Sequence, residues 1–311
     1  MVVHGGAGTI LKKNMSAEKE QLYVEALRQS LQAGYNIIKR GGSSVDAVEA
    51  AIHILEDNPL FNAGKGAVFT NAGTNELDAS IMEGEELKAG AVAGVTTIKN
   101  PISAARAVME KSEHVLMAGR GAERFAQDCG LETVDPAYFK TEDRWRALQR
   151  ALSADSAKAA AGKMSSKLSP SVVDEKFGTV GCVALDRSGN LAAGTSTGGM
   201  TNKKYGRIGD APIIGAGTYC DNNTAGVSCT GWGEYFIRNA VAKTVCDLIA
   251  YKAYDIKKAS EEVLKKVADM GGSGGLIILD RNGNAAMPFN TEGMYRGTVT
   301  TDGKIEVFIY K

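Results

Sequence analysis

The chain has 311 residues, of which 44% are hydrophobic, so it can bury a sizeable core as one large domain or two smaller ones. Lys plus Arg and Asp plus Glu both number 36, which gives a formal net charge of zero. This balance gives no electrostatic reason to expect nucleic acid or an anionic membrane as a partner. No apolar run approaches the roughly 20 residues that a membrane helix needs, so we expect no membrane partner.

The cysteine count and the N-terminus bear on the compartment. The five cysteines are odd in number and no pair has CxxC spacing, which favours buried free thiols in a reducing compartment. The start, Met1 to Gly5, lacks the basic-then-apolar layout of a signal peptide. We therefore predict a cytoplasmic protein, and a periplasmic one if a presequence has been removed.

The first half of the chain predicts a strand followed by helices. Residues 1–8 read as an apolar strand that enters a glycine-rich turn. Ser16 is a candidate N-cap for a first amphipathic helix. Ser43 and Asp46 have the spacing of a capping box at the start of a second helix. Strand-like segments and two more helices then carry the chain to about residue 151.

The composition changes after this point. Residues 153–177 are rich in Ala, Ser and Lys and contain Pro170, so they predict a solvated linker. The linker is followed by β-type runs, turns and helical patterns in blocks rather than in a regular βαβ alternation. Such blocks predict layered α/β packing, with helices outside two antiparallel sheets. The expected elements are hairpins over 179–185 with 191–197 and over 276–279 with 285–287, and helices over 234–251 and 255–269.

The junction between the linker and the next strand reads Gly178-Thr179-Val180-Gly181. A threonine hydroxyl is a poor nucleophile unless a base lies beside it, and the chain has only three histidines. An N-terminal threonine has such a base in its own α-amine, whose pKa is about 7.7–8.0. Cleavage of the Gly178–Thr179 bond would create that amine. On spacing alone, the alternative of an ordinary structural strand stays open.

Eight short motifs, read in order, extend from the first residues to the last thirty. Together they resemble the plant-type asparaginase and isoaspartyl-peptidase family of N-terminal-nucleophile hydrolases. The resemblance implies a four-layer αββα sandwich. It also implies one structural domain, cut into an α subunit of residues 1–178 and a β subunit of residues 179–311. The motifs are His4-Gly5-Gly6-Ala7-Gly8, Phe61-Asn62-Ala63-Gly64, Leu77-Asp78-Ala79-Ser80-Ile81-Met82, Gly178-Thr179-Val180-Gly181, Thr195-Ser196-Thr197-Gly198-Gly199, Gly206-Arg207-Ile208-Gly209-Asp210, Thr230-Gly231-Trp232-Gly233-Glu234 and Phe289-Asn290-Thr291-Glu292-Gly293-Met294.

The resemblance also implies catalytic roles. Thr179 corresponds to the nucleophile, and Thr197 to the second threonine that supports it. Thr230 and Gly231 correspond to the oxyanion hole, where a hydroxyl and a backbone N–H face the developing charge. Asn62 corresponds to a support of the active-site hydrogen-bond network. Without the resemblance, these residues would be read as strand and turn positions.

A substrate clamp is implied in the same way. Arg207 and Asp210 correspond to the groups that hold the α-carboxylate and the α-ammonium of the substrate, and Gly231 and Gly233 line the same place. A guanidinium suits a carboxylate and a carboxylate suits an ammonium. From spacing alone, an Arg and an Asp three residues apart are more often a surface ion pair, and that alternative stays open.

The resemblance implies no cofactor for catalysis but a structural Na⁺ in a loop. Hard cations prefer oxygen ligands, and backbone carbonyls can supply them whatever the side chains. The carbonyls that correspond to the family's sodium loop are those of Leu55, Glu56, Asn58, Phe61, Ala63 and Lys65.

The expected activity is hydrolysis of L-asparagine to L-aspartate and ammonia, and of β-aspartyl (isoaspartyl) dipeptides, after self-cleavage. The expected partners are such small molecules and a second cleaved protomer, in an (αβ)₂ assembly. Two alternatives remain: a glycosylasparaginase-like hydrolase, and an uncleaved binder of a small amino acid without catalysis. The residues before the nucleophile, Lys176-Phe177-Gly178, favour the plant-type branch, because glycosylasparaginases typically carry Asp there.

Overall fold

The computed structural model describes residues 1–160 and 178–311, and their strands form two sheets. The larger sheet contains β1 (Val2–Gly8), β2 (Leu77–Glu83), β3 (Ala89–Val95), β4 (Leu116–Ala118), β5 (Val180–Leu185), β6 (Leu191–Thr197), β11 (Gly293–Val299) and β12 (Ile305–Tyr310). The smaller sheet contains β7 (Thr218–Cys220), β8 (Gly226–Gly231), β9 (Gly274–Leu279) and β10 (Ala285–Ala286). The strand orders are β12-β11-β1-β5-β6-β2-β3-β4 and β10-β9-β8-β7.

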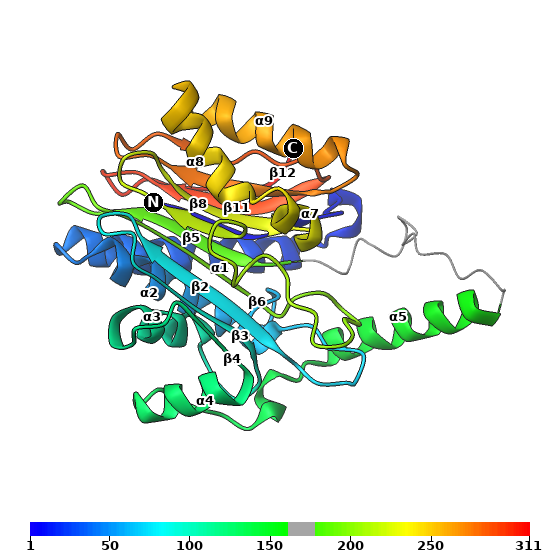
Figure 1. Ribbon diagram of the computed structural model, residues 1–311. Coiled ribbons are helices and arrows are strands. Elements are labelled where there is room, and N and C mark those ends of the chain that lie inside the picture. The colour runs from blue at the N-terminus through cyan, green and yellow to red at the C-terminus, as the bar shows by residue number, and fades with distance from the viewer. Residues whose placement is uncertain (161–177) are drawn as a thin grey trace.

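Helices cover the outer face of each sheet (Figure 1). On the larger sheet lie α1 (Ala17–Lys39), α2 (Ser44–Glu56), α3 (Pro101–Lys111) and α4 (Gly119–Asp128). On the smaller sheet lie α8 (Val241–Lys252) and α9 (Ile256–Asp269). The remaining helices are α5 (Glu142–Ala160), α7 (Gly233–Arg238) and the short 3₁₀ turns η1 (Lys12–Asn14), η2 (Gly64–Gly66) and η3 (Pro136–Phe139).

Three buried clusters define the layers. One lies between the larger sheet and its helices, one between the smaller sheet and α8 and α9, and the third between the two sheets. Alternate residues of a strand point to opposite faces, so Val2 joins the inter-sheet cluster and Val3 the helix-facing one. Leu276 and Ile277 divide in the same way on β9. The predicted four-layer αββα architecture of an N-terminal-nucleophile hydrolase is confirmed.

The two sheets are antiparallel with one exception. β4 pairs with β3 in parallel, joined through α3, so the prediction of two purely antiparallel sheets is wrong at this edge. A parallel neighbour needs a crossover connection, and the helix between residues 101 and 111 provides it.

The locally encoded elements are confirmed. The Ser16 side chain accepts a hydrogen bond from the Lys19 N–H at the start of α1. Ser43 and Asp46 form the predicted capping box of α2. β5 and β6 pair as a hairpin, and so do β9 and β10. The second hairpin is short, since β10 ends at Ala286, two residues before Pro288.

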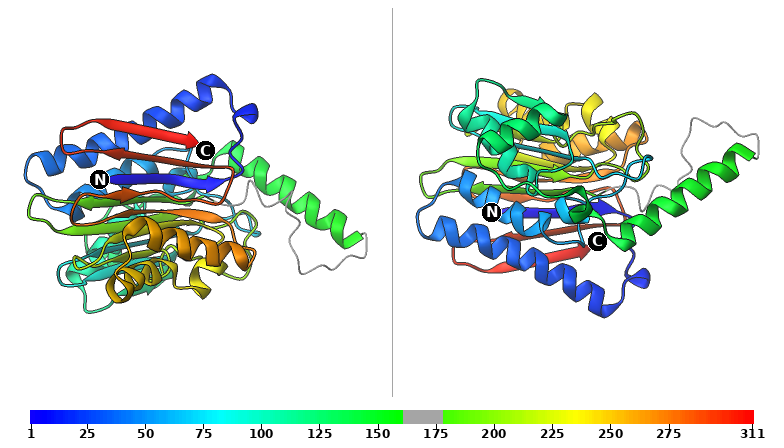
Figure 2. Two further views of the ribbon diagram at one scale, coloured as in Figure 1. Left: turned by 90° about the horizontal axis from the view of Figure 1, so that it is seen from above. Right: turned by 90° about the horizontal axis from the view of Figure 1, so that it is seen from below.

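Two element boundaries are wrong in the sequence analysis. The linker predicted over 153–177 is helical up to residue 160 and otherwise lies outside the described residues. The helix begins earlier, is rich in Ala and is anchored by buried Leu148 and Ala151 on its inner face. It extends away from the body of the molecule (Figures 1 and 2).

The second error concerns the helix predicted over 234–251. The chain breaks between α7 and α8, where Ala240 has a left-handed backbone with φ of 42°. In the first turn of α8, the N–H groups of Ala242 and Lys243 donate to the carbonyl oxygens of Ala216 and Gly215, in the loop before β7. That long-range docking turns the helix axis, which a local pattern does not reveal.

All five cysteines are free thiols, and four of them are buried. Across residues 1–160 and 178–311, the helices include no candidate for a membrane span.

We predict that the inter-sheet core carries a large share of the stability. Leu191, at the start of β6, is 0% exposed, whereas Leu22 on α1 is 57% exposed. In a Thr179→Ala background, which should remain a single chain, Leu191→Ala should lower the free energy of unfolding by about 2–5 kcal/mol. The matched control Leu22→Ala should change it by less than about 0.5 kcal/mol. Equal losses in chemical denaturation would contradict the layer assignment.

Candidate active site

The Gly178–Thr179 peptide lies where β5 enters the larger sheet. β5 is hydrogen-bonded between β1 and β6, and Val180 pairs with Ser196 near the end of β6. This antiparallel register brings the first residue after the linker beside the last residues of β6. Thr179 and Thr197 are 6% and 3% exposed, so the junction is buried.

The two threonines converge on one carbonyl oxygen. The Oγ1 of Thr179 lies 2.7 Å from the carbonyl oxygen of Gly178 and 3.2 Å from the Oγ1 of Thr197. Thr197 donates to the same carbonyl at 3.0 Å and accepts from the Gly199 N–H at 3.0 Å. The hydroxyl of Thr179 is therefore held against the peptide group that would have to break.

Asn62 is the third group on this carbonyl. Its Nδ2 donates to the carbonyl oxygens of Gly178 at 2.9 Å and Gly199 at 2.7 Å, which uses both amide hydrogens. Its Oδ1 accepts from the Val68 N–H at 2.9 Å, and this contact fixes the orientation of the amide. The loop after α2 is thus tied to the ends of β5 and β6.

Glycines allow the backbones to approach at this junction. A Cβ at position 178 would lie 3.1 Å from the Cβ of Asn62. On the other side, a Cβ at Gly6 of β1 would lie 3.2 Å from the Cα of Gly178, and Gly6 has a φ of +112° that disfavours other residues.

Thr230 and Gly231 end β8 in the facing sheet. The Ala7 N–H donates to the Thr230 Oγ1 at 3.4 Å, which links β8 to the strand that adjoins Gly178. Gly231 has a φ of +151°, and a Cβ there would lie 2.4 Å from the carbonyl oxygen of Ser273. Only glycine fits this close approach of the two backbones.

The two charged residues of the expected clamp do not pair with each other. Arg207 makes a bidentate ion pair with Glu234, with Nε–Oε1 at 2.9 Å and Nη2–Oε2 at 2.8 Å. Asp210 is 5% exposed, and its Oδ2 has no hydrogen-bond partner among the described residues. The alternative of a surface ion pair between Arg207 and Asp210 is therefore wrong.

The side chains of Arg207 and Asp210 both lie close to Gly233. A Cβ at Gly233 would lie 2.8 Å from the Oδ1 of Asp210 and 2.9 Å from the Nη2 of Arg207. A guanidinium and a carboxylate thus face one glycine at the start of α7.

Glu234 was not predicted as a site residue, although it is the last residue of the motif that begins at Thr230. Its contact with Arg207 spans 27 positions, so no local pattern indicates it.

Burial raises the pKa of Asp210 to about 7, although nearby Arg207 opposes the shift. Desolvation disfavours the charged carboxylate more than the neighbouring guanidinium favours it. Buried carboxyls that lack a partner and lie beside an opposite charge are typical of ligand sites.

The expected sodium loop turns tightly around its carbonyls. A Cβ at Gly66 would lie 2.0 Å from the carbonyl oxygen of Phe61, and a Cβ at Gly64 would lie 2.4 Å from that of Glu56. The carbonyls of Asn58 and Ala63 accept hydrogen bonds from Phe61 and Gly66 within the loop. Within the described part of the chain, no three His, Cys, Asp or Glu side chains form a group that could hold a metal ion.

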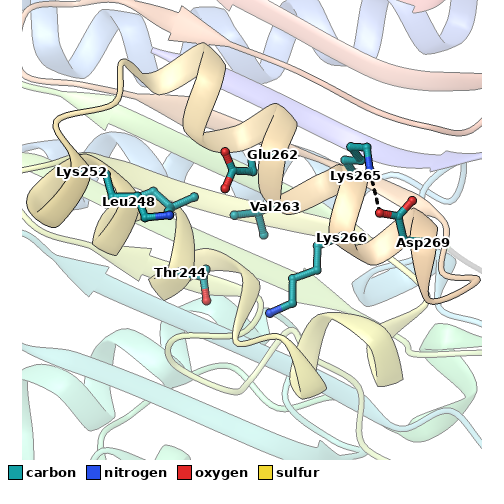
Figure 3. Close-up of a pocket in the computed structure, with 8 residues that line it drawn as sticks. All are labelled: Thr244, Leu248, Lys252, Glu262, Val263, Lys265, Lys266 and Asp269. Carbon is teal, nitrogen blue, oxygen red and sulfur yellow. Dashed lines mark hydrogen bonds and ion pairs between the residues drawn. The ribbon is translucent and has the colours of Figure 1, made fainter.

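A surface groove lies elsewhere, between α8 and α9 (Figure 3). Its lining includes Lys265 and Asp269, which form an ion pair at 2.8 Å. It belongs to the outer helical layer and contains none of the residues around Thr179.

Residues 1–309 match the family model described as asparaginase. The chain belongs to this family. It is 50% identical to the isoaspartyl peptidases of Salmonella typhimurium and Escherichia coli, over 95% of this chain and 93% and 91% of theirs. It is 44% identical to the plant-type L-asparaginase of Pyrococcus furiosus over 94% of each chain. The predicted membership of the plant-type asparaginase and isoaspartyl-peptidase family is confirmed, and the protein is a hydrolase.

We predict that Asp210 lowers the stability of this asparaginase-family fold as the pH rises. Between its ordinary value of about 3.9 and about 7, the folded state keeps a proton that the unfolded state releases. The free energy of unfolding should fall by up to about 1.4 kcal/mol per pH unit across this window. Asp210→Asn should remove this contribution, so the free energy of unfolding of the variant should exceed that of the parent by an amount that grows from pH 4 to 7 and then levels off.

The measurement is chemical denaturation of both proteins across this pH range. Asp128→Asn, at the exposed end of α4, is the control and should leave the slope as it is. An identical slope in the Asp210→Asn protein would contradict the assignment.

Proposed function

We propose that this protein cleaves itself before Thr179 and then hydrolyses L-asparagine to L-aspartate and ammonia, and β-aspartyl dipeptides to their amino acids. The observation that carries the proposal is the buried hydroxyl of Thr179, 2.7 Å from the carbonyl oxygen of Gly178 and supported by Thr197. The printed names of the relatives, isoaspartyl peptidase and plant-type L-asparaginase, support the same substrates.

Self-cleavage starts from the uncut peptide. The Oγ1 of Thr179 attacks the carbonyl carbon of Gly178, and the charge that develops on the oxygen is stabilised by Asn62 and Thr197. The C–N bond breaks, the Thr179 nitrogen takes the proton, and an ester joins Gly178 to the hydroxyl. Water then hydrolyses the ester, which leaves a carboxylate on Gly178 and a free amine on Thr179.

Turnover uses the new amine as the base. Its pKa of about 7.7–8.0 leaves a useful neutral fraction near pH 7, and it takes the proton from the Thr179 hydroxyl. The oxygen attacks the side-chain carbonyl of the substrate, and Thr230 and Gly231 hold the oxyanion. Ammonia or an amino acid leaves with that proton, and water releases aspartate from the acyl-enzyme.

The clamp residues bind the α-amino-acid end of the substrate. Arg207 binds the α-carboxylate and Asp210 the α-ammonium, with Gly233 between them. Glu234 holds the guanidinium plane through two hydrogen bonds at 2.9 and 2.8 Å, which reduces the freedom that Arg207 loses on binding. The unpartnered Oδ2 of Asp210 is available for the ammonium, which would stabilise the carboxylate form.

Thr179→Ala should abolish both reactions, because the alanine has no nucleophile and creates no hydroxyl-bearing N-terminus. Thr179→Ser keeps a hydroxyl and should still split and turn over. The measurements are gel electrophoresis after long incubation and ammonia release from L-asparagine. A split, active alanine variant would sink the assignment of the nucleophile.

Gly233→Ala should raise the KM for L-asparagine by about 10- to 100-fold, because displacing one charged hydrogen bond costs about 1.5–3 kcal/mol. The added methyl would lie 2.8 Å from Asp210 and 2.9 Å from Arg207. Self-cleavage should proceed at the parent rate. The control Gly121→Ala meets nothing within 4 Å and should leave KM as it is. An unchanged KM in Gly233→Ala would count against the clamp.

We also propose a structural Na⁺ held by the backbone carbonyls of Leu55, Glu56, Asn58, Phe61, Ala63 and Lys65. Support comes from the glycines of the loop, where side chains would fill the space against the carbonyls of Glu56 and Phe61. The ion would brace the segment that carries Asn62 and take no part in a chemical step.

Sodium chloride should then raise Tm above that in tetramethylammonium chloride of equal ionic strength. Saturating a site a hundredfold above its Kd stabilises by about 2.7 kcal/mol. Gly66→Ala should remove the difference, because its Cβ would lie 2.0 Å from the carbonyl oxygen of Phe61. Equal Tm values of the parent in the two salts would rule the site out.

We propose an (αβ)₂ dimer of cleaved protomers in the cytoplasm. The family resemblance supports this assembly, and a monomeric mass in sedimentation velocity would contradict the dimer.

The five free thiols support a reducing compartment, and recovery of the protein from the periplasmic fraction of the native host would contradict a cytoplasmic location.

A further inference from the structure

A chain of buried polar side chains runs between the two sheets, from the carbonyl of Thr179 to the loop that carries Asp210. Each member is 0% exposed, and the members come from five strands. None of them belongs to the nucleophile, the oxyanion hole or the clamp. They are His4 of β1, Ser228 of β8, Thr195 of β6, Thr218 of β7 and Ser80 of β2.

The first half of the chain starts at the nucleophile. The Nδ1 of His4 lies 3.0 Å from the carbonyl oxygen of Thr179, and its Nε2 lies 3.0 Å from the Oγ of Ser228. Ser228 lies 2.6 Å from the Oγ1 of Thr195. Two residues after Ser228 on the same strand face is Thr230 of the proposed oxyanion hole.

The second half ends at the clamp. The Oγ1 atoms of Thr195 and Thr218 are 2.5 Å apart, and the Oγ of Ser80 is 2.8 Å from Thr218. Ser80 donates to the carbonyl oxygen of Ala211 at 2.6 Å, and Ala211 directly follows Asp210.

The available hydrogens give this chain one direction. A carbonyl oxygen only accepts, so the Nδ1 of His4 must carry the hydrogen that faces Thr179. Burial lowers the pKa of His4 to about 3, so the ring is neutral near pH 7 and its Nε2 is an acceptor. Ser228 must then donate its single hydrogen to His4.

The same count fixes the remaining hydroxyls. With its hydrogen committed, Ser228 can only accept from Thr195, which shares its single hydrogen between Ser228 at 2.6 Å and the carbonyl oxygen of Gly217 at 3.2 Å. Thr195 can then only accept from Thr218. Thr218 is left as an acceptor for Ser80, which is the direction in which Ser80 approaches it. Ser80 therefore shares one hydrogen between Thr218 and the carbonyl of Ala211.

Gly181 leaves the space that the hydrogen bond between His4 and Ser228 occupies. A Cβ at this position would lie 2.0 Å from the Oγ of Ser228 and 2.4 Å from the Nε2 of His4. The glycine that follows Thr179 by two residues thus makes room for the contact between β1 and β8, a purpose that the chemistry of Thr179 alone does not require.

We infer that His4 is a positioning residue, held as the neutral Nδ1–H tautomer at the end of an ordered hydrogen-bond chain that couples Thr179 to the loop of Asp210. The ring fixes the carbonyl of the nucleophile, and the far end fixes the carbonyl next to the ammonium-binding carboxylate. The expected effect of His4 on kcat and KM rests on the proposed function, whereas the tautomer of the His4 ring does not depend on it.

The tautomer is tested by ¹⁵N NMR on histidine-labelled Thr179→Ala protein, which needs no cleavage or activity. The chain has three histidines, and loss of one set of signals in His4→Asn assigns His4. We expect a protonated Nδ1 and an unprotonated Nε2 at pH 7. An Nε2–H tautomer or a doubly protonated ring would overturn the inference.

The coupling is tested at the far end. Thr218→Val removes a hydroxyl that does not contact His4 and should shift the His4 ring resonances. Thr97→Val is the control, because the Thr97 hydroxyl is buried without a hydrogen-bond partner among the described residues, and it should leave the resonances in place. Unmoved His4 signals in Thr218→Val would overturn the coupling.

The positioning role is tested by a pair of amides in the cleaved enzyme. An Asn side chain can present its amide N–H in place of Nδ1–H, and a Gln side chain can present its amide oxygen to Ser228 in place of the acceptor Nε2. His4→Asn should keep kcat within about threefold and raise KM, because it keeps the bond to Thr179 and breaks the chain. His4→Gln should lower kcat by roughly 10- to 100-fold, as a misplaced reacting group does. Equal effects of the two variants on kcat and KM would show that His4 only fills space.

Discussion

The carbonyl oxygen of Gly178 is the point on which the rest of the site depends. Three donors reach it: the amide of Asn62 and the hydroxyls of Thr197 and Thr179. They come from a loop after α2, the end of β6 and the residue that follows the carbonyl itself. A group that accepts three hydrogen bonds is polarised and fixed, and both properties favour attack at its carbon.

The layered fold is what makes that convergence possible. β5 is central in the larger sheet, between β1 and β6, so its first residues are enclosed rather than frayed. The facing sheet supplies Thr230 from β8 and, through the loops around it, Arg207 and Asp210. The site therefore lies at one end of the inter-sheet layer, where side chains from both sheets meet. Its buried carboxyl reduces stability at neutral pH, and the core between the sheets must offset that cost.

The sequence predicted what is local. The capping box of Ser43 and Asp46, the N-cap at Ser16 and the hairpin of β5 with β6 follow from patterns within about twenty residues, and each is present. The motif resemblance named the candidate residues, and the structure groups Thr179, Thr197 and Asn62 around the carbonyl of Gly178. The partner of Arg207 was not predicted, since the bidentate contact with Glu234 depends on how a loop and a helix dock.

The errors have the same origin. The parallel strand β4 and the break at Ala240 are set by long-range packing. His4 was named as the first residue of the first motif but was given no role, because its two contacts, to Thr179 and Ser228, span 175 and 224 positions. A composition rich in Ala, Ser and Lys is compatible with a helix as well as with a linker, and packing of Leu148 decided between them.

Self-cleavage of the Gly178–Thr179 bond is the step that would create the nucleophile. Intact mass spectrometry with N-terminal sequencing, over a long incubation of the purified protein, tests it most directly. We expect two fragments, one that ends at Gly178 and one that begins Thr179-Val180-Gly181-Cys182, formed at a first-order rate that does not depend on protein concentration. A chain that never splits, or one that splits at another bond, would contradict it.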